Sequence, residues 1–126
     1  MKKQIFLYFL ILFLGLRIEA SAQSAEEQNV SKTIDRLVVA MIAADREMLN
    51  PLLSDALHYG HSSGLIQDKS GFVDEVVSKS PLSYISIDRE KEVIHLSKKT
   101  ATVSHILTIK GKNPAGDPVN IRIGNM

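Results

Sequence analysis

Hydrophobic residues recur at the spacing of an α-helix in the segment that follows Ser24. Ser24 and Glu27 have the spacing of a capping box, and the apolar stripe behind them runs to about Ala44. Its positions fit one face of a helix with 3.6 residues per turn: Val30, Ile34, Leu37, Val38, Met41 and Ile42. A second stripe predicts a helix over residues 69–79, capped by Asp68 and burying one edge: Phe72, Val73, Val76 and Val77.

A short helix is expected between these two. Asp45 is a suitable N-cap for a helix that reaches Leu53, but Pro51 lies inside that range. Either the helix kinks at the proline, or Asn50 caps a fresh turn in which Pro51 is the first residue. The pattern predicts three helices in all and leaves the geometry around Pro51 open.

Alternation with a period of two replaces the helical spacing elsewhere. Residues 56–62 predict a short strand in which Leu57, Tyr59 and His61 share one face, followed by a turn at residues 62–64. Longer antiparallel strands are expected over three stretches: residues 84–96, 101–110 and 119–126. In the middle one, the residues that share a face are Ala101, Val103, His105, Leu107 and Ile109. The class is therefore α+β.

Two features of these long strands bear on function. The mixed charges at residues 88–92 are most simply the solvated middle of an exposed face, and we assign them no chemistry. The last strand begins just before the final residue, Met126, and would leave an open sheet edge, which proteins usually avoid. Either an oligomer covers this edge or the chain is a truncated version of a longer one, and we favour truncation.

The first 22 residues have the pattern of a secretory signal peptide. Lys2 and Lys3 precede an apolar run over residues 5–16, which is shorter than the roughly 20 residues needed to span a bilayer. Residues 20–22 then fit the small-x-small cleavage pattern. We expect cleavage after Ala22 and a single domain over residues 23–126, exported to the periplasm or secreted. A retained membrane anchor is the alternative.

Composition narrows the classes of function further. Of 15 basic and 14 acidic residues, the mature part keeps 12 and 13, and no basic stripe suggests a nucleic-acid partner. The chain has no cysteine, which excludes disulfides, thiolate metal sites and a cysteine nucleophile. It also excludes a lipoprotein anchor, so we expect no membrane attachment once the signal peptide is removed.

The order of these elements resembles the nuclear-transport-factor-2-like superfamily, and more specifically its SnoaL-like branch, domain of unknown function 4440. The resembling segments are residues 40–53, 54–59, 61–64, 68–72, 100–103 and 121–123. The resemblance implies a cone-shaped, curved antiparallel sheet wrapped by three N-terminal helices, with a pocket inside. Members usually end with a further strand carrying a Gly-x-Trp-like motif, and this chain has no tryptophan. The chain is therefore expected to lack the last strand of the family.

Two motifs suggest a specific chemistry, but the structural elements or ligands that this chemistry requires are not predicted around them. Residues 60–64 satisfy G-x-S-x-G, but a nucleophile elbow requires a strand, a sharp turn and an immediate helix in a large parallel sheet. His58 and His61 are expected to point to opposite faces of a strand and so cannot easily share a metal ion. A site between His61 and His105 would need a carboxylate that the sequence does not place. We therefore predict no metal and no cofactor.

Four polar residues are the candidates for lining a cavity: Tyr59, His61, His105 and Arg122. Tyrosine can donate a hydrogen bond to a carbonyl and histidine can transfer a proton near neutrality. Equally, Tyr59 could pack its ring in the core and His105 could be an ordinary buried histidine. The expected function is binding of a small, partly apolar molecule. The alternatives are an acid–base enzyme of isomerase, dehydratase or cyclase type, with His61 as base and Tyr59 or Arg122 polarising a carbonyl, or an interaction module that forms a homodimer through its sheet.

Overall fold

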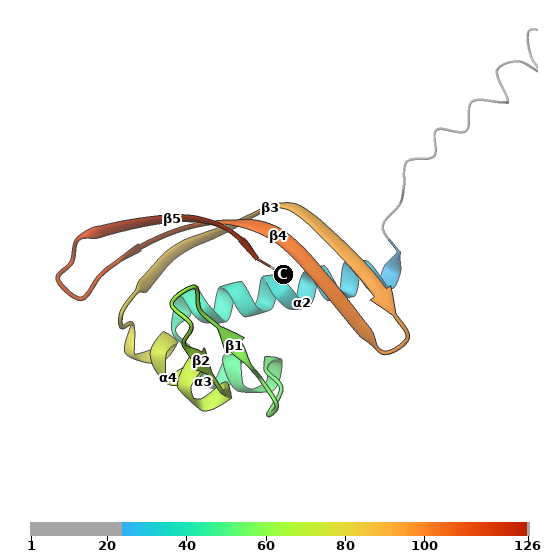
Figure 1. The fold of residues 1–126 in the computed structure, drawn as a ribbon, viewed down its shortest axis with the longest axis horizontal. Coiled ribbons are helices and arrows are strands. Elements are labelled where there is room, and N and C mark those ends of the chain that lie inside the picture. Colours follow the sequence, from blue (N-terminus) through green and yellow to red (C-terminus); the bar gives the residue numbers. More distant parts are fainter. Residues whose placement is uncertain (1–23, 126) are drawn as a thin grey trace, which may run out of the picture.

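A computed structural model describes residues 24–125 as one curved sheet arched over a long helix (Figure 1). The elements follow the order helix, short helix, small hairpin, helix and three long strands. This is the α+β arrangement expected from the sequence. The predicted signal peptide, residues 1–22, and its cleavage after Ala22 lie outside the described residues, as does Met126.

The three predicted helices form with the predicted caps. Helix α2 spans Ala25–Ala43, and at its start the backbone amides of Ser24 and Glu27 each donate to the other residue's side chain, at 2.8 and 3.1 Å. Helix α4 spans Lys69–Ser78, and its cap Asp68 accepts from the Gly71 amide at 2.8 Å. Helix α3, Arg46–Leu49, is capped by Asp45 in the same way.

The chain around Pro51 changes from α-helix to a 3₁₀ turn, and Asn50 is the first residue of that turn and not its cap. Helix α3 gives way to a 3₁₀ turn, η1 (Asn50–Leu52), which contains Pro51 in its first turn. Proline has no backbone N–H and cannot continue an α-helical hydrogen-bond ladder. The side chain of Leu49, just before this turn, is fully buried.

The predicted strand over residues 56–62 is shorter than expected. Only β1, Tyr59–Gly60, is extended, and it pairs antiparallel with β2, Ile66–Gln67, a strand that the sequence did not indicate. The turn between them places Gly64 at φ +88°, a conformation that favours glycine. This hairpin lies beside α4, across from the large sheet (Figure 1).

The large sheet has the strand order β3-β4-β5 and is antiparallel throughout: β3 spans Ser83–Ser97, β4 Thr100–Lys112 and β5 Pro118–Asn125. The register places Arg89, Leu107 and Ile123 in one row across the three strands, and Asp88, Thr108 and Arg122 in the next. Neighbouring rows point to opposite faces. We call the face toward α2 the concave face and the other the convex face.

Strand β3 contains an irregularity that the sequence pattern did not show. Glu90 pairs with Ile106 and Val93 with Ser104, so Lys91 and Glu92 together stand opposite His105. Lys91 has φ +52°, which marks an extra residue in a β-bulge. Because the extra residue changes the alternation, Arg89 and Glu92 both face the concave side.

The best-packed core lies where α2, α3 and α4 meet: Ala40, Leu49, Phe72, Val73 and Val76. The sheet adds three buried side chains: Ile87, Ile94 and Ile109. Strand β5 is an edge strand that pairs with β4 only as far as His105. The predicted truncation after Met126 stays a prediction. Among residues 24–125, no helix is both long and apolar enough to span a bilayer.

Candidate functional site

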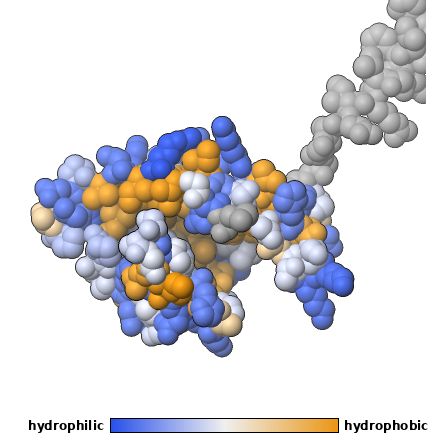
Figure 2. All heavy atoms as spheres, viewed as in Figure 1, coloured by the Kyte–Doolittle hydropathy of each residue, from blue (hydrophilic) through white to orange (hydrophobic). Residues whose placement is uncertain are grey.

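A cavity of about 250 Å³ lies between α2 and the concave face. We call it the narrow cavity. Figure 2 shows hydrophobic side chains gathered around the hollow between the sheet and the elements below it. Most of the lining is aliphatic or aromatic, from α2, α4, β4 and the segments around α3 and β1: Ile34, Leu37, Val38, Met41, Leu53, Leu57, Phe72, Val103, Leu107 and Ile109. The residues of β4 that line it are odd-numbered, which confirms the alternation expected for this strand.

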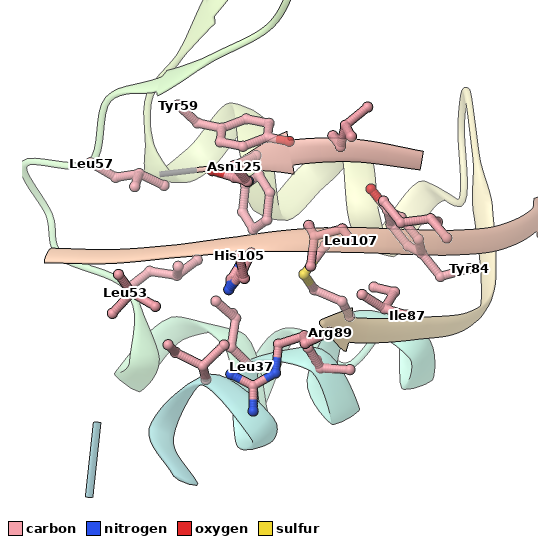
Figure 3. Close-up of a pocket in the computed structure, with 17 residues that line it drawn as sticks. Leu37, Leu53, Leu57, Tyr59, Tyr84, Ile87, Arg89, His105, Leu107 and Asn125 are labelled. Atoms are coloured by element: carbon pink, nitrogen blue, oxygen red, sulfur yellow. The ribbon is translucent and has the colours of Figure 1, made fainter. Parts of the chain in front are cut away.

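Polar groups from four strands converge on the same cavity: Tyr59, Tyr84, Arg89, His105 and Asn125. Figure 3 shows His105 and Arg89 pointing toward α2, while Tyr59 and Asn125 lie toward the opposite end. The narrow cavity therefore has an apolar body with a charged region near α2 and hydroxyl and amide groups at its other end.

The charged region is a network centred on Arg89. Its guanidinium forms ion pairs with Asp35 of α2 and with Glu92, and its side chain is only 13% exposed. Glu92 also accepts a hydrogen bond from the Ser31 hydroxyl at 2.7 Å. The prediction that residues 88–92 form a solvated face without further role is thus wrong for Arg89 and Glu92. The bulge at Lys91 turns both side chains inward.

His105 lies next to this network but forms no hydrogen bond with it through Nδ1. Its Nδ1 is buried and has no hydrogen-bond partner, and it lies 3.8 Å from the nearer carboxylate oxygen of Glu92. Burial lowers the pKa of His105 below its ordinary value, and the Arg89 charge lowers it further, against a smaller opposing effect of Glu92. At neutral pH the imidazole is therefore uncharged.

A second, wider cavity of about 620 Å³ adjoins the narrow one. It lies between the β1–β2 hairpin, α4 and strand β5, and we call it the wide cavity. The two cavities share part of their lining: Tyr59, Tyr84, Ile109, Ile123 and Asn125. The polar groups that line only the wide cavity include His58, His61, Ser62 and Glu75. Together the two cavities form one concavity with a more apolar and a more polar half.

A hydrogen-bond chain holds His61 at the wide cavity. Gln67 donates from its Nε2 to Glu75 at 2.7 Å, and its Oε1 lies 2.7 Å from Nε2 of His61. Because an amide oxygen only accepts, this arrangement assigns the proton to Nε2 of His61 and leaves Nδ1 as the basic nitrogen. The ring of His61 also meets Tyr59 edge-on, with centroids 4.6 Å apart.

The two tyrosines at the junction of the cavities stay protonated. Burial raises the pKa of Tyr84 to about 12, with smaller contributions from Tyr59 and Glu75. Burial and then the Glu75 charge also raise the pKa of Tyr59. Both hydroxyls can therefore donate hydrogen bonds over the whole physiological range of pH.

The structure brings together three of the four residues predicted to line a cavity. Tyr59 lines both halves, His105 the narrow one and His61 the wide one. Arg122 instead lies on the convex face, where it donates to Glu90 at 2.8 Å and to Thr108 at 3.0 Å. Arg122 is next to Ile123 in β5, and because the row of Ile123 faces inward, the side chain of Arg122 faces outward and cannot act at this site.

Sequence reasoning missed several residues of the site: Gln67, Glu75, Tyr84, Arg89, Glu92 and Asn125. Tyr84 and Asn125 could have been found from the register of the sheet, but the pattern alone does not fix that register. His58 also lines the wide cavity, although alternation predicted that it would point away from His61. The regular strand includes only Tyr59 and Gly60, so alternation does not govern the histidines beside it.

Two other features of the sequence were the G-x-S-x-G match at residues 60–64 and the histidines considered as metal ligands. In residues 60–64, a hairpin turn leads to β2 and not to a helix, which is wrong for a nucleophile elbow. No group of three or more His, Asp or Glu side chains within residues 24–125 is arranged to hold a metal ion.

Comparison with known proteins identifies the fold. No protein-family model and no curated protein matches the chain. Among solved structures, an NTF2-like (nuclear-transport-factor-2-like) protein from Cytophaga hutchinsonii superposes with a TM-score of 0.71 at 20% identity, over 80% of this chain and 82% of that one. The chain has the NTF2-like fold.

Two further solved structures are similar to this chain. A putative Ca/calmodulin-dependent kinase II association domain from Exiguobacterium sibiricum has a TM-score of 0.72 at 17% identity, over 82% of this chain and 79% of that one. An NTF2-like protein of unknown function in nutrient uptake from Rhodospirillum rubrum has a TM-score of 0.67 at 19% identity, over 75% and 78%. At such identities the likeness concerns the fold and leaves function to be argued from the site.

Proposed function

We propose that this protein is an exported domain of the SnoaL-like branch that binds a small, partly apolar molecule in the concavity of its sheet. The observation that carries the proposal is the narrow cavity, in which aliphatic side chains form the body and a few polar groups converge at the ends. Binding sites for small molecules are typically concave, mostly apolar and equipped with a small number of polar groups that orient the ligand.

The polar groups of the site are suited to orienting such a molecule. The hydroxyls of Tyr59 and Tyr84 are donors at the junction of the two cavities. A ligand group that accepts a hydrogen bond from one of them would be held in a defined orientation. The site thus favours a ligand that carries at least one hydrogen-bonding group on an apolar frame.

A bulky substitution tests whether the cavity binds. Leu107→Trp should fill the narrow cavity and weaken binding of an apolar probe such as 4-phenyl-1-butanol by at least about tenfold, measured by calorimetry. The control is Lys110→Trp, on the exposed, convex face of the same strand, which should bind as the wild type does. Wild-type protein that fails to bind the probe, or a Leu107→Trp variant that binds it unchanged, would count against the proposal.

Export has support in the sequence alone. Lys2, Lys3, the apolar run over residues 5–16 and the small residues at 20–22 are the features of a cleaved signal. Expression of the full chain with analysis of the N-terminal peptide by mass spectrometry should give Gln23 as the first residue of the exported protein. An N-terminus at Met1 in all fractions would contradict export by cleavage.

The homodimer through the sheet, one of the alternatives drawn from the sequence, stays a prediction.

Acid–base catalysis is a second candidate, supported by the chain from His61 through Gln67 to Glu75. A base whose tautomer is held by a neighbour is ready to accept a proton at its other nitrogen, and Tyr59 beside it can polarise a carbonyl. For any substrate found by screening carbonyl compounds, His61→Asn should abolish turnover, while His95→Asn, at an exposed position outside both cavities, retains it. Full turnover by the His61→Asn variant would remove the proposed base.

A further inference from the structure

The charges around the concavity are unevenly balanced. At the narrow cavity, the single guanidinium of Arg89 already pairs with two carboxylates, those of Asp35 and Glu92. This network therefore carries one net negative charge, and Arg89 has little capacity left to hold an anionic ligand. Arg89 is the charged residue that lines this cavity, and its ion pairs with the two carboxylates offset its positive charge.

Glu75 adds a second negative charge at the wide cavity, and it has no cationic partner. Among residues 24–125, no lysine, arginine or histidine lies within ion-pair distance of its carboxylate, although the side chain is only partly exposed. Its one side-chain hydrogen bond comes from Gln67, an uncharged amide, at 2.7 Å. A partly buried carboxylate without a counter-charge is costly unless something else supplies one.

The surroundings of Glu75 are aromatic. Tyr59 and Tyr84 line the wide cavity with it, and its charge contributes to the raised pKa of both phenols. Both rings also line the narrow cavity, and Figure 3 shows them among the side chains around it. Aromatic faces attract cations, and together with a carboxylate they form a suitable environment for an ammonium group.

We propose that the ligand of this site is an organic amine, whose ammonium group binds to Glu75 beside Tyr59 and Tyr84 while its apolar part fills the narrow cavity. This inference rests on the proposed binding function and specifies the chemistry of the ligand. A carboxylate-bearing ligand is disfavoured, because it would meet Glu75 at one end of the site and the Asp35–Arg89–Glu92 network at the other. A metal ion is disfavoured by the absence of a third protein ligand near Glu75 within residues 24–125.

Three probes that share one apolar frame test the charge preference. Calorimetry at neutral pH compares 4-phenylbutylamine, 4-phenyl-1-butanol and 5-phenylpentanoate, which differ only in an ammonium, hydroxyl or carboxylate end. We expect the amine to bind at least about tenfold more tightly than the alcohol, and the carboxylate to bind more weakly than either. The variant Glu75→Gln should remove most of the difference between amine and alcohol. This substitution keeps the size of the side chain and an oxygen that accepts from Gln67.

The control variant is Glu90→Gln, which removes a carboxylate on the convex face that pairs with Arg122. It should leave the preference for the amine unchanged, and thermal unfolding verifies that both variants are folded. Equal binding of amine and alcohol to the wild type, or an unchanged preference in Glu75→Gln, would overturn the inference while leaving the binding function intact. Failure of all three probes to bind would overturn both.

Discussion

His105 is a residue whose chemistry depends on its neighbours in space. It is separated by 13 positions from Glu92 in the sequence, yet the bulge in β3 brings Glu92 and Arg89 beside it. Burial and Arg89 lower its pKa below the ordinary value of 6.5. In the folded protein the ring resists protonation at a pH where the unfolded chain accepts a proton.

This difference predicts a dependence of stability on pH. Because the pKa is lower in the folded state, the unfolded state binds more protons below about pH 6.5, so stability should fall as the pH falls. Between about pH 7.5 and about pH 5.5, the wild type should lose more free energy of unfolding in urea than a His105→Gln variant does. Identical losses in the two proteins would show that His105 is not the group responsible.

At the scale of single residues, alternation along β4 predicted correctly that His105 faces the same side as Val103 and Leu107. The same reasoning failed for Arg89 and Glu92, because a bulge leaves no mark in the pattern of apolar and polar residues. It failed for Arg122 because the inward face of β5 depends on its register with β4, which no local feature of the sequence specifies.

Among the elements, the bulge at Lys91 determines the most about the site. Lys91 adopts φ +52°, and the bulge allows Arg89 and Glu92 both to keep their side chains on the concave face, while Glu90 stays on the convex face. Without the additional residue, a shift of one position would turn one of the two segments over. Arg89 and Glu92 could then no longer meet.

Substitution and deletion at this position should have opposite consequences. Lys91→Gly should leave the free energy of unfolding unchanged or raise it by up to about 1 kcal/mol, since glycine adopts a positive φ without steric cost. Deletion of Lys91 should instead lower the free energy of unfolding by on the order of 3 kcal/mol, because it separates partly buried ion-pair partners. Urea unfolding measures both, with Lys110→Gly, at a strand position without a positive φ, as the destabilised control. A deletion variant as stable as the wild type would contradict this role of the bulge.

For the whole molecule, the packing is tightest at the end where the helices meet. The fully buried side chains there include Leu49, Val73 and Val76, while a cavity remains between α2 and the concave face of the sheet. The meeting point of the helices thus supplies the most tightly packed part of the core, and the space under the sheet is left for a ligand, with Phe72 contributing to both.

Truncation of a side chain in this core should cost far more than truncation of an exposed one. Leu49→Ala should lower the free energy of unfolding by about 2–5 kcal/mol, because the side chain is completely buried. Leu65→Ala, at a site that is 53% exposed on the hairpin, should change it by less than about 0.5 kcal/mol. Chemical denaturation of the two variants checks the prediction, and similar losses in both would contradict it.

The sequence by itself determined the helices, their caps, the long strands and the fold class, because these depend on local hydrogen bonding and on the spacing of apolar residues. It also placed Tyr59, His61 and His105 among the polar groups of a cavity. Only the tertiary structure decided that Arg89, Glu92, Glu75 and Tyr84 join them and that Arg122 does not. The physical reason is that register, bulges and the packing of the hairpin on α4 arise from contacts between residues far apart in the chain, and these contacts determine which side of the sheet each group faces.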